Sequence, residues 1–153
     1  MTSKIRKNDI GLSDTIENSI LVTDIDGNVY KTVQIGEQVW MAENLRVTKY
    51  RDGTSIPNVK DSEAWACSIE GAYCHPEHNV QYGKTYGALY NYDAVTDSRN
   101  IAPVGWHVPT DGEWKELEMY LGMSKSDSDR IGYGRGTNEG SKLAGNAKLW
   151  IEE

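Results

Sequence analysis

Residues 20–41, ILVTDIDGNVYKTVQIGEQVWM, constrain the fold more than any other segment because two turn signals separate three short stretches of strand-forming residues. Asp26-Gly27 is typical of a two-residue β-hairpin turn, and Gly36 opens a second turn. Between the turns the side chains alternate. One face carries Val29, Lys31, Val33 and Ile35, and the other carries Tyr30, Thr32 and Gln34. The segment is therefore predicted to form a β-meander with one buried face.

The clearest helix signal lies at residues 111–121. Thr110 and Glu113 have the spacing of a capping box, in which each side chain accepts a hydrogen bond from the other residue's backbone N–H. An apolar stripe follows at Trp114, Leu117 and Leu121. Gly122 stands where a left-handed residue ends a helix. We expect Trp114, together with Trp40 at a strand end, to pack in the core.

A second helix is predicted over residues 86–95, because apolar and small residues recur there at spacings of three and four. Residues 44–81 contain turn signals and few apolar repeats, which predicts a long folded loop. The glycine-rich segment IGYGRGTNEGS, at 131–141, is predicted to be a further loop. These elements together predict the α+β class, with an N-terminal β-meander followed by two helices and a long loop.

Charge argues against nucleic acid as a partner. The chain carries 23 acidic and 16 basic residues, a net charge of −7, which repels a phosphate backbone. The basic residues Lys4, Arg6 and Lys7 lie in a polar segment, 1–19, that we expect to be a loosely ordered leader. No apolar run approaches the roughly 18 residues of a membrane span, so no span is predicted.

Neither a metal site nor a cofactor site is predicted. Asp24, Asp26 and Asn28 resemble the start of a calcium loop. However, a calcium-loop register with glycine at Gly27 would place valines at the first and twelfth positions, so a hairpin turn is favoured. The glycines at 132, 134 and 136 lack the strand and helix that a phosphate-binding loop requires.

Catalysis is not predicted either. No serine lies in a nucleophile elbow, and the histidines are His75, His78 and His107. His107 lies at the entry to the capped helix, where a structural role is favoured. Glu116 and Glu118 are two residues apart on a predicted helix and so diverge. The catalytic residue set is predicted to be empty.

Cys67 and Cys74 both lie in the predicted loop. A disulfide between them is favoured if the protein reaches an oxidising compartment. A zinc site that also uses His75 and His78 remains an alternative, although its spacing matches no common zinc framework. Two free thiols are the other alternative.

Aromatic composition favours a polar binding surface. The chain has five Trp, nine Tyr and no Phe, so every Trp and Tyr ring carries an N–H or O–H group. Such rings stack on sugars while their polar groups reach hydroxyls. Trp65, Tyr73 and Tyr82 lie in or next to the long loop, and we interpret them as the exposed binding residues.

Three longer blocks give a family resemblance. They are WMAENL at 40–45, YGALYNY at 86–92 and APVGWHVPTDGEW at 102–114. With DGNVYKTVQIG before them and GSKLAGNAKLW after them, they resemble the Fibrobacter succinogenes major paralogous domain from about residue 20 to the end. The GWHVPTDGEW block is also similar to the helix entry of formylglycine-generating sulfatase-modifying domains. Both resemblances imply a C-type-lectin-like fold.

The resemblance implies an extracellular or cell-surface location, because the family occurs mainly in exported proteins and lipoproteins of Bacteroidetes and Fibrobacteres. Family domains continue past the position of Trp150, through a Gly-Gly-Tyr-Arg segment and a Trp-Trp-Ser-rich stretch. Residues 20–153 are therefore expected to be the N-terminal part of the domain, and the fold to be incomplete.

These observations together favour a non-catalytic cell-surface recognition domain with a glycan or protein ligand. One alternative is an enzyme of the formylglycine-generating type whose active site lies in the C-terminal part. Another alternative is a structural module of an envelope or fimbrial assembly, in which an unpaired sheet edge awaits a partner strand.

Overall fold

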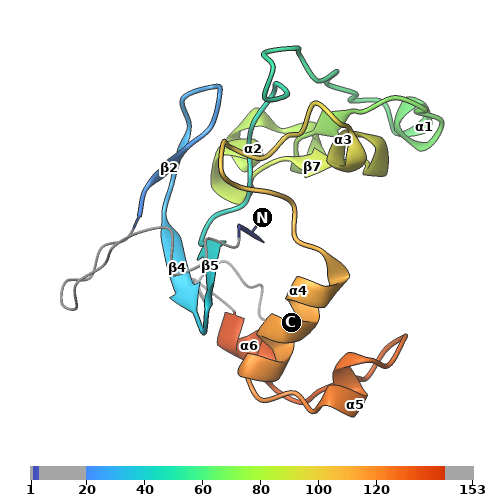
Figure 1. Cartoon of the computed structure of the whole chain (residues 1–153). Helices are drawn as coiled ribbons and strands as arrows, with labels where there is room; N and C mark the ends of the chain where they lie inside the picture. Colours follow the sequence, from blue (N-terminus) through green and yellow to red (C-terminus); the bar gives the residue numbers. More distant parts are fainter. Residues whose placement is uncertain (1, 4–19, 144–153) are drawn as a thin grey trace. The chain divides into compact units, whose positions relative to one another are not determined.

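The computed structural model describes residues 2–3 and 20–143, and it divides into two compact units, Met1–Pro109 and Thr110–Glu153 (Figure 1). Apart from Thr2 and Ser3, the expected leader lies outside the described residues. The first unit contains β1 (Thr2–Ser3), β2 (Val22–Thr23), β3 (Val29–Tyr30), β4 (Thr32–Ile35), β5 (Gln38–Met41), α1 (Ser62–Ala66), β6 (Tyr73–Cys74), the 3-10 helix η1 (Pro76–His78), α2 (Val80–Tyr86), β7 (Leu89–Tyr90) and α3 (Tyr92–Thr96). The second contains α4 (Asp111–Tyr120), α5 (Lys125–Ser128) and α6 (Glu139–Leu143). The α+β class is thereby confirmed.

Both predicted turns form, but the strands belong to two sheets. Strands β2 and β3 pair across the Asp26-Gly27 turn, and β4 pairs with β5 across Gly36 in a three-stranded sheet of order β1-β5-β4. Gly27 and Gly36 have φ values of 82° and 62°, a conformation that glycine adopts without strain. The predicted middle strand is interrupted at Lys31. The meander is therefore two successive hairpins.

The inner face of these hairpins carries Tyr30 and Thr32, while Val29 and Val33 are exposed. Tyr30 is fully buried at the centre of the first unit's core. The other members of this core are Val22, Met41, Leu45, Val47, Tyr50, Ile56, Tyr73, Ala94, Ile101, Ala102 and Trp106. Trp40 is also buried, as expected. Polar aromatic rings thus supply much of the buried volume in a chain without phenylalanine.

The Asp24 carboxylate organises the first hairpin. It accepts hydrogen bonds from the backbone N–H groups of Asp26 and Asn28, from Asn28 Nδ2 and from the Tyr30 hydroxyl, at 2.6–2.9 Å. The Tyr30 hydroxyl in turn accepts the Arg46 N–H at 3.0 Å. These bonds occupy the carboxylate that resembled a calcium ligand, and the hairpin interpretation is confirmed.

Asp26 connects the hairpin to the long loop. Its carboxylate accepts the Thr48 N–H and hydroxyl and forms an ion pair with Lys49 at 2.9 Å. Burial by itself raises the pKa of Asp26, but the bonds from Thr48 and Lys49 outweigh it and lower the pKa below the usual carboxyl value. The ionised form is therefore the one that stabilises this junction.

Residues 44–81 form mostly loop, as expected, with the short elements α1, β6 and η1 inserted. The predicted helix over 86–95 is wrong. Helix α2 ends at Tyr86, strand β7 follows, and α3 begins after Asn91. Gly87 interrupts the helix because its φ is 81° and a Cβ atom there would lie 2.5 Å from the Asn44 Cβ. Long-range packing of the chain decides this break.

In the second unit the capping box of α4 is confirmed. The Thr110 N–H and hydroxyl bind Glu113 Oε2 at 2.8 and 3.0 Å, and the Glu113 N–H binds Thr110 Oγ1 at 3.3 Å. Leu117 is buried and Gly122 adopts a φ of 115°. Trp114, which we expected in the core, is 42% exposed. Of the predicted stripe, only Leu117 is fully buried.

Among the described residues, no helix combines the length and apolar character that crossing a bilayer requires.

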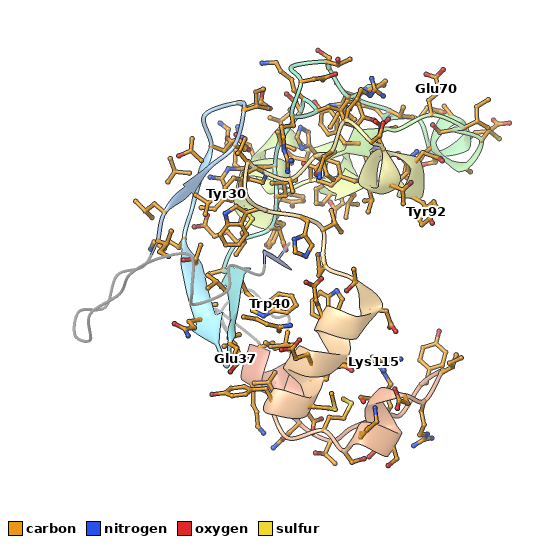
Figure 2. All side chains as sticks on the ribbon, in the orientation of Figure 1. Tyr30, Glu37, Trp40, Glu70, Tyr92 and Lys115 are labelled. Carbon is orange, nitrogen blue, oxygen red and sulfur yellow. The ribbon has the colours of Figure 1, made fainter. Side chains whose placement is uncertain are left out.

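Replacing Tyr30 by Phe should lower the free energy of unfolding by about 1–3 kcal/mol, since one oxygen of Asp24 and the partly buried Arg46 N–H both lose a partner. Urea denaturation followed by circular dichroism measures the change. Tyr92→Phe is the matched control because Tyr92 is 78% exposed (Figure 2 labels both tyrosines). Equal stability of the two variants would contradict the role of the Tyr30 hydroxyl.

The lowered pKa of Asp26 predicts acid sensitivity. Its contribution to stability is complete above the unfolded carboxyl pKa of about 3.9 and is lost as pH falls through the lower folded pKa. Wild-type protein should therefore lose stability between about pH 5 and pH 2 more steeply than Asp26→Asn. Urea denaturation across this range measures the slopes, and parallel curves would refute the assignment.

Candidate functional site

A cavity of about 560 Å³ lies in the first unit, within the size range of about 300–1,000 Å³ that is typical of small-molecule sites. Its lining residues come from segments far apart in the sequence. They are Tyr50, Ser55, Pro57, Ile69, Glu70, Gly71, Asp93, Asp97 and Arg99. We refer to it as the Tyr50–Arg99 cavity.

Arg99 forms one wall of this cavity. Its guanidinium stacks over the Tyr50 ring with 3.9 Å between the Cζ atom and the ring centroid. Asp97 holds the guanidinium through two hydrogen bonds, at 2.9 Å to Nε and 2.6 Å to an Nη atom. These bonds hold the pKa of Asp97 well below its usual value, at about 2. The charge of Arg99 is thus matched within the protein.

The neighbouring loop is fixed by Arg51. Its guanidinium donates to the backbone carbonyls of Ala102, Pro103 and Trp106 at 2.8–3.1 Å, and its own N–H donates to the Asn100 carbonyl. One side chain thus donates to three backbone carbonyl groups of this loop. The segment that carries Asp97 and Arg99 is therefore held beside Tyr50.

Asn91 fixes the opposite wall. Its side chain donates to the Glu70 carbonyl at 2.7 Å and accepts the N–H groups of Ala72 and Ala94 at 2.9 and 3.0 Å. As the N-cap of α3 it joins that helix to residues 70–72. Glu70 and Asp93 consequently line the same cavity. Glu70 projects outward from the segment that follows α1 (Figure 2).

The floor of the cavity is made by Tyr50 and Gly71. Tyr50 is 1% exposed, and its buried hydroxyl makes no hydrogen bond of normal length and angle with a described residue, although the Arg99 guanidinium lies close enough to exert a lowering effect on its pKa. A Cβ atom at Gly71 would lie 1.9 Å from this hydroxyl, so only glycine permits the contact. Burial raises the pKa of Tyr50, and the charge of Asp97 adds to the effect. The hydroxyl therefore stays protonated at neutral pH.

Comparison with known protein families gives a match that covers most of the chain. Residues 33–153, most of the chain, match the Fibrobacter succinogenes major domain. The chain belongs to this family. No curated protein and no solved structure matches it. The resemblance of the sequence blocks to this family is confirmed.

None of the three binding residues predicted from the sequence lines the cavity of this family member. Trp65 is half-buried on α1. Tyr73, which we expected to be exposed, is only 8% exposed because it packs in the core against Tyr90 and His75. Tyr82 is 38% exposed on α2. The structure therefore does not bring Trp65, Tyr73 and Tyr82 together at this cavity.

Tyr82 instead forms an exposed pair with Tyr86. The ring centroids are 5.8 Å apart in an edge-to-face arrangement, as expected for residues four apart on one helix face. Leu89, on the following strand, is also exposed. This exposed aromatic pair is a second candidate surface of the first unit.

Both cysteines are free thiols in the structure, so the expected disulfide is not formed there. Cys67 is exposed at the end of α1, whereas Cys74 is buried on β6, where burial raises the pKa of its thiol. In the described part of the chain no group of three or more His, Cys, Asp and Glu residues is placed to bind a metal ion.

Sequence reasoning missed the cavity residues. Asp97 and Arg99, two positions apart, have the pattern of a surface ion pair, and Tyr50 stands next to a turn without a distinguishing motif. A useful signal was the glycine at 71 between acidic and apolar residues, since such a glycine can mark a close approach.

Gly71→Ala should lower the free energy of unfolding by about 1–3 kcal/mol, because the new methyl group overlaps the Tyr50 hydroxyl. Combining it with Tyr50→Phe should recover part of the loss, and Tyr50→Phe alone should not destabilise. Gly140→Ala is the control, since nothing lies within 4 Å of a Cβ atom there. Additive effects of the two substitutions in urea denaturation would contradict the contact.

Proposed function

We propose that this chain is a non-catalytic recognition domain of a cell-surface or extracellular protein, and that it binds a glycan in the Tyr50–Arg99 cavity. The observation that carries the proposal is the buried hydroxyl of Tyr50, a residue that lines the cavity, which makes no hydrogen bond of normal geometry with a described residue. A buried polar group without a hydrogen bond costs about 1–3 kcal/mol, so such a group indicates an interaction that a ligand completes.

The chemistry of the other lining groups supports a sugar. Glu70 and Asp93 provide acceptors, Arg99 provides donors, and the Tyr50 hydroxyl can act as either. Sugar hydroxyls also donate and accept, so they match a mixed set of this kind. Ile69, which is 90% exposed, gives the cavity an apolar rim for the C–H face of a sugar ring.

The family resemblance supports the proposed location. The resemblance implies exported proteins, in which surface glycans are available as ligands. The α+β architecture is compatible with the C-type-lectin-like fold that the sequence blocks imply, and such scaffolds serve widely in binding. Analogy of fold is a weaker argument than the site itself. The proposal therefore rests on the cavity.

The exposed Tyr82–Tyr86 pair favours a second candidate function, binding of a protein partner. Tyrosines are enriched at protein interfaces because they combine a large apolar ring with a polar end. On this reading the ligand covers α2 and leaves the cavity open. The two candidates differ in which tyrosines the ligand contacts.

A glycan array probed with the labelled protein should show saturable binding to a limited set of glycans. Tyr50→Phe should weaken that binding about three- to tenfold, the size of one hydrogen bond, with no loss of stability. Tyr82→Ala, on the other surface, should leave it unchanged. The opposite ranking of the two variants would move the site to α2, and an array without any signal would overturn glycan binding.

A further inference from the structure

The charges at the cavity are unequal. Glu70, Asp93 and Asp97 contribute three carboxylates, and Arg99 contributes the one cation among the lining residues. The two hydrogen bonds between Asp97 and Arg99 pair that cation internally. The carboxylates of Glu70 and Asp93 then remain as two uncompensated negative charges.

In the described part of the chain these two carboxylates have no partner. Neither the Glu70 nor the Asp93 carboxylate makes a hydrogen bond or ion pair with another described residue, and both residues are exposed toward solvent. Their backbones are nevertheless fixed, because Asn91 binds the Glu70 carbonyl and caps the helix that carries Asp93. The rim thus presents two acceptors at fixed positions without a cation of the protein.

The Tyr50 hydroxyl is an independent indication of a ligand at the same place. It is buried and makes no hydrogen bond of normal geometry with a described residue. Tyr50 lines the same cavity as the two carboxylates. A neutral phenol accepts a hydrogen bond from an ammonium group as readily as from a hydroxyl. Glu70, Asp93 and the Tyr50 hydroxyl therefore form a set of acceptors in the lining of one cavity.

This set selects among ligand charges. A phosphate, sulfate or uronic acid would face two unpaired carboxylates, and like charges disfavour binding. A divalent metal ion is disfavoured because no group of three or more carboxylate, imidazole or thiol ligands is in place among the described residues. An ammonium group satisfies the carboxylates and requires only a single positive charge.

We propose that the Tyr50–Arg99 cavity takes a glycan with free amino groups, an unacetylated hexosamine chain, whose ammonium group lies between Glu70 and Asp93. This inference rests on the proposed glycan-binding function and specifies its ligand. The hydroxyl groups of the same sugar form hydrogen bonds with the Arg99 guanidinium and the Tyr50 hydroxyl.

A matched series of β-1,4-linked pentasaccharides tests the ligand class, because its members differ only at the C2 substituent. The probes are the glucosamine, N-acetylglucosamine and glucose pentamers, titrated against the full chain by calorimetry at neutral or slightly acidic pH. The glucosamine pentamer should bind at least about tenfold more tightly than the other two, which corresponds to about 1.4 kcal/mol. Raising the salt concentration should reduce this preference, since the contact is ionic.

Each outcome has a defined meaning. Equal or tighter binding of the glucose or acetylated pentamer would overturn the amino-sugar inference while glycan binding itself survives. Binding of none of the three, together with an empty glycan array, would overturn the proposed function. If added calcium ions bound to the cavity in preference to the glucosamine pentamer, the ligand would be a metal ion and not an ammonium group, and the inference would also be overturned.

Charge-matched variants locate the contact. Glu70→Gln combined with Asp93→Asn should reduce affinity for the glucosamine pentamer at least about tenfold, because hydrogen bonds to charged groups are the stronger class. Glu37→Gln combined with Glu63→Gln removes the same charge from exposed positions that do not line the cavity. Glu37 lies at the far turn of the β4–β5 hairpin, well away from Glu70 (Figure 2).

The control pair should lose less than about twofold in affinity, the effect of distant screened charges. Equal losses in the two double variants would show attraction by net charge alone and overturn the proposed contact. Circular dichroism of all variants verifies folding. If a folded Glu70→Gln, Asp93→Asn protein kept its affinity for the glucosamine pentamer, the proposed contact would be overturned as well.

Discussion

The buried Asp24 carboxylate is the constraint on which the first unit depends. It accepts four hydrogen bonds within the first hairpin, one of them from Tyr30, and Tyr30 passes the connection to the Arg46 N–H. Asp26 and Tyr90 bind the same stretch at Thr48 and at the Val47 carbonyl. Residues 46–48 are thus held from several sides. Because Tyr50 follows two residues later, the hairpin also determines where the cavity floor lies.

The cavity is assembled by polar side chains that bind backbone groups across large sequence separations. Arg51 satisfies carbonyls more than fifty residues ahead of it, and Asn91 joins α3 to residues 70–72. A chain with short strands gains little rigidity from its β-sheets. These side-chain hydrogen bonds therefore hold the segments together where the backbone hydrogen bonds of long strands would otherwise do so. Each of the two side chains binds several backbone groups. The unpaired groups of the site, Glu70 and Asp93, stand on segments that these bonds hold.

Local signals in the sequence predicted local structure correctly. The Asp26-Gly27 turn and the Thr110–Glu113 capping box form because their partners lie within a few residues. The helix expected at 86–95 failed because Gly87 packs against Asn44 and the Ala88 N–H binds the Leu45 carbonyl. Tyr73 was misjudged for a similar reason, since its partner strand is β7. The cavity likewise depends on contacts between distant residues, because no spacing in the sequence reveals that Arg99 stacks on Tyr50.

The absence of phenylalanine gives the unpaired Tyr50 hydroxyl its significance. Every buried tyrosine adds a hydroxyl that must find a partner, and the hydroxyls of Tyr30 and Tyr90 find theirs in Asp24 and in a backbone carbonyl. At position 50 a phenylalanine would fill the same volume, keep the stacking on Arg99 and avoid an unsatisfied buried oxygen. A tyrosine there lowers the stability of the empty protein in exchange for a polar group inside the cavity. Under the proposed function, a ligand that supplies the missing donor or acceptor gains that bond, and one that cannot leaves the hydroxyl unpaired, so the same atom would contribute to both affinity and selectivity.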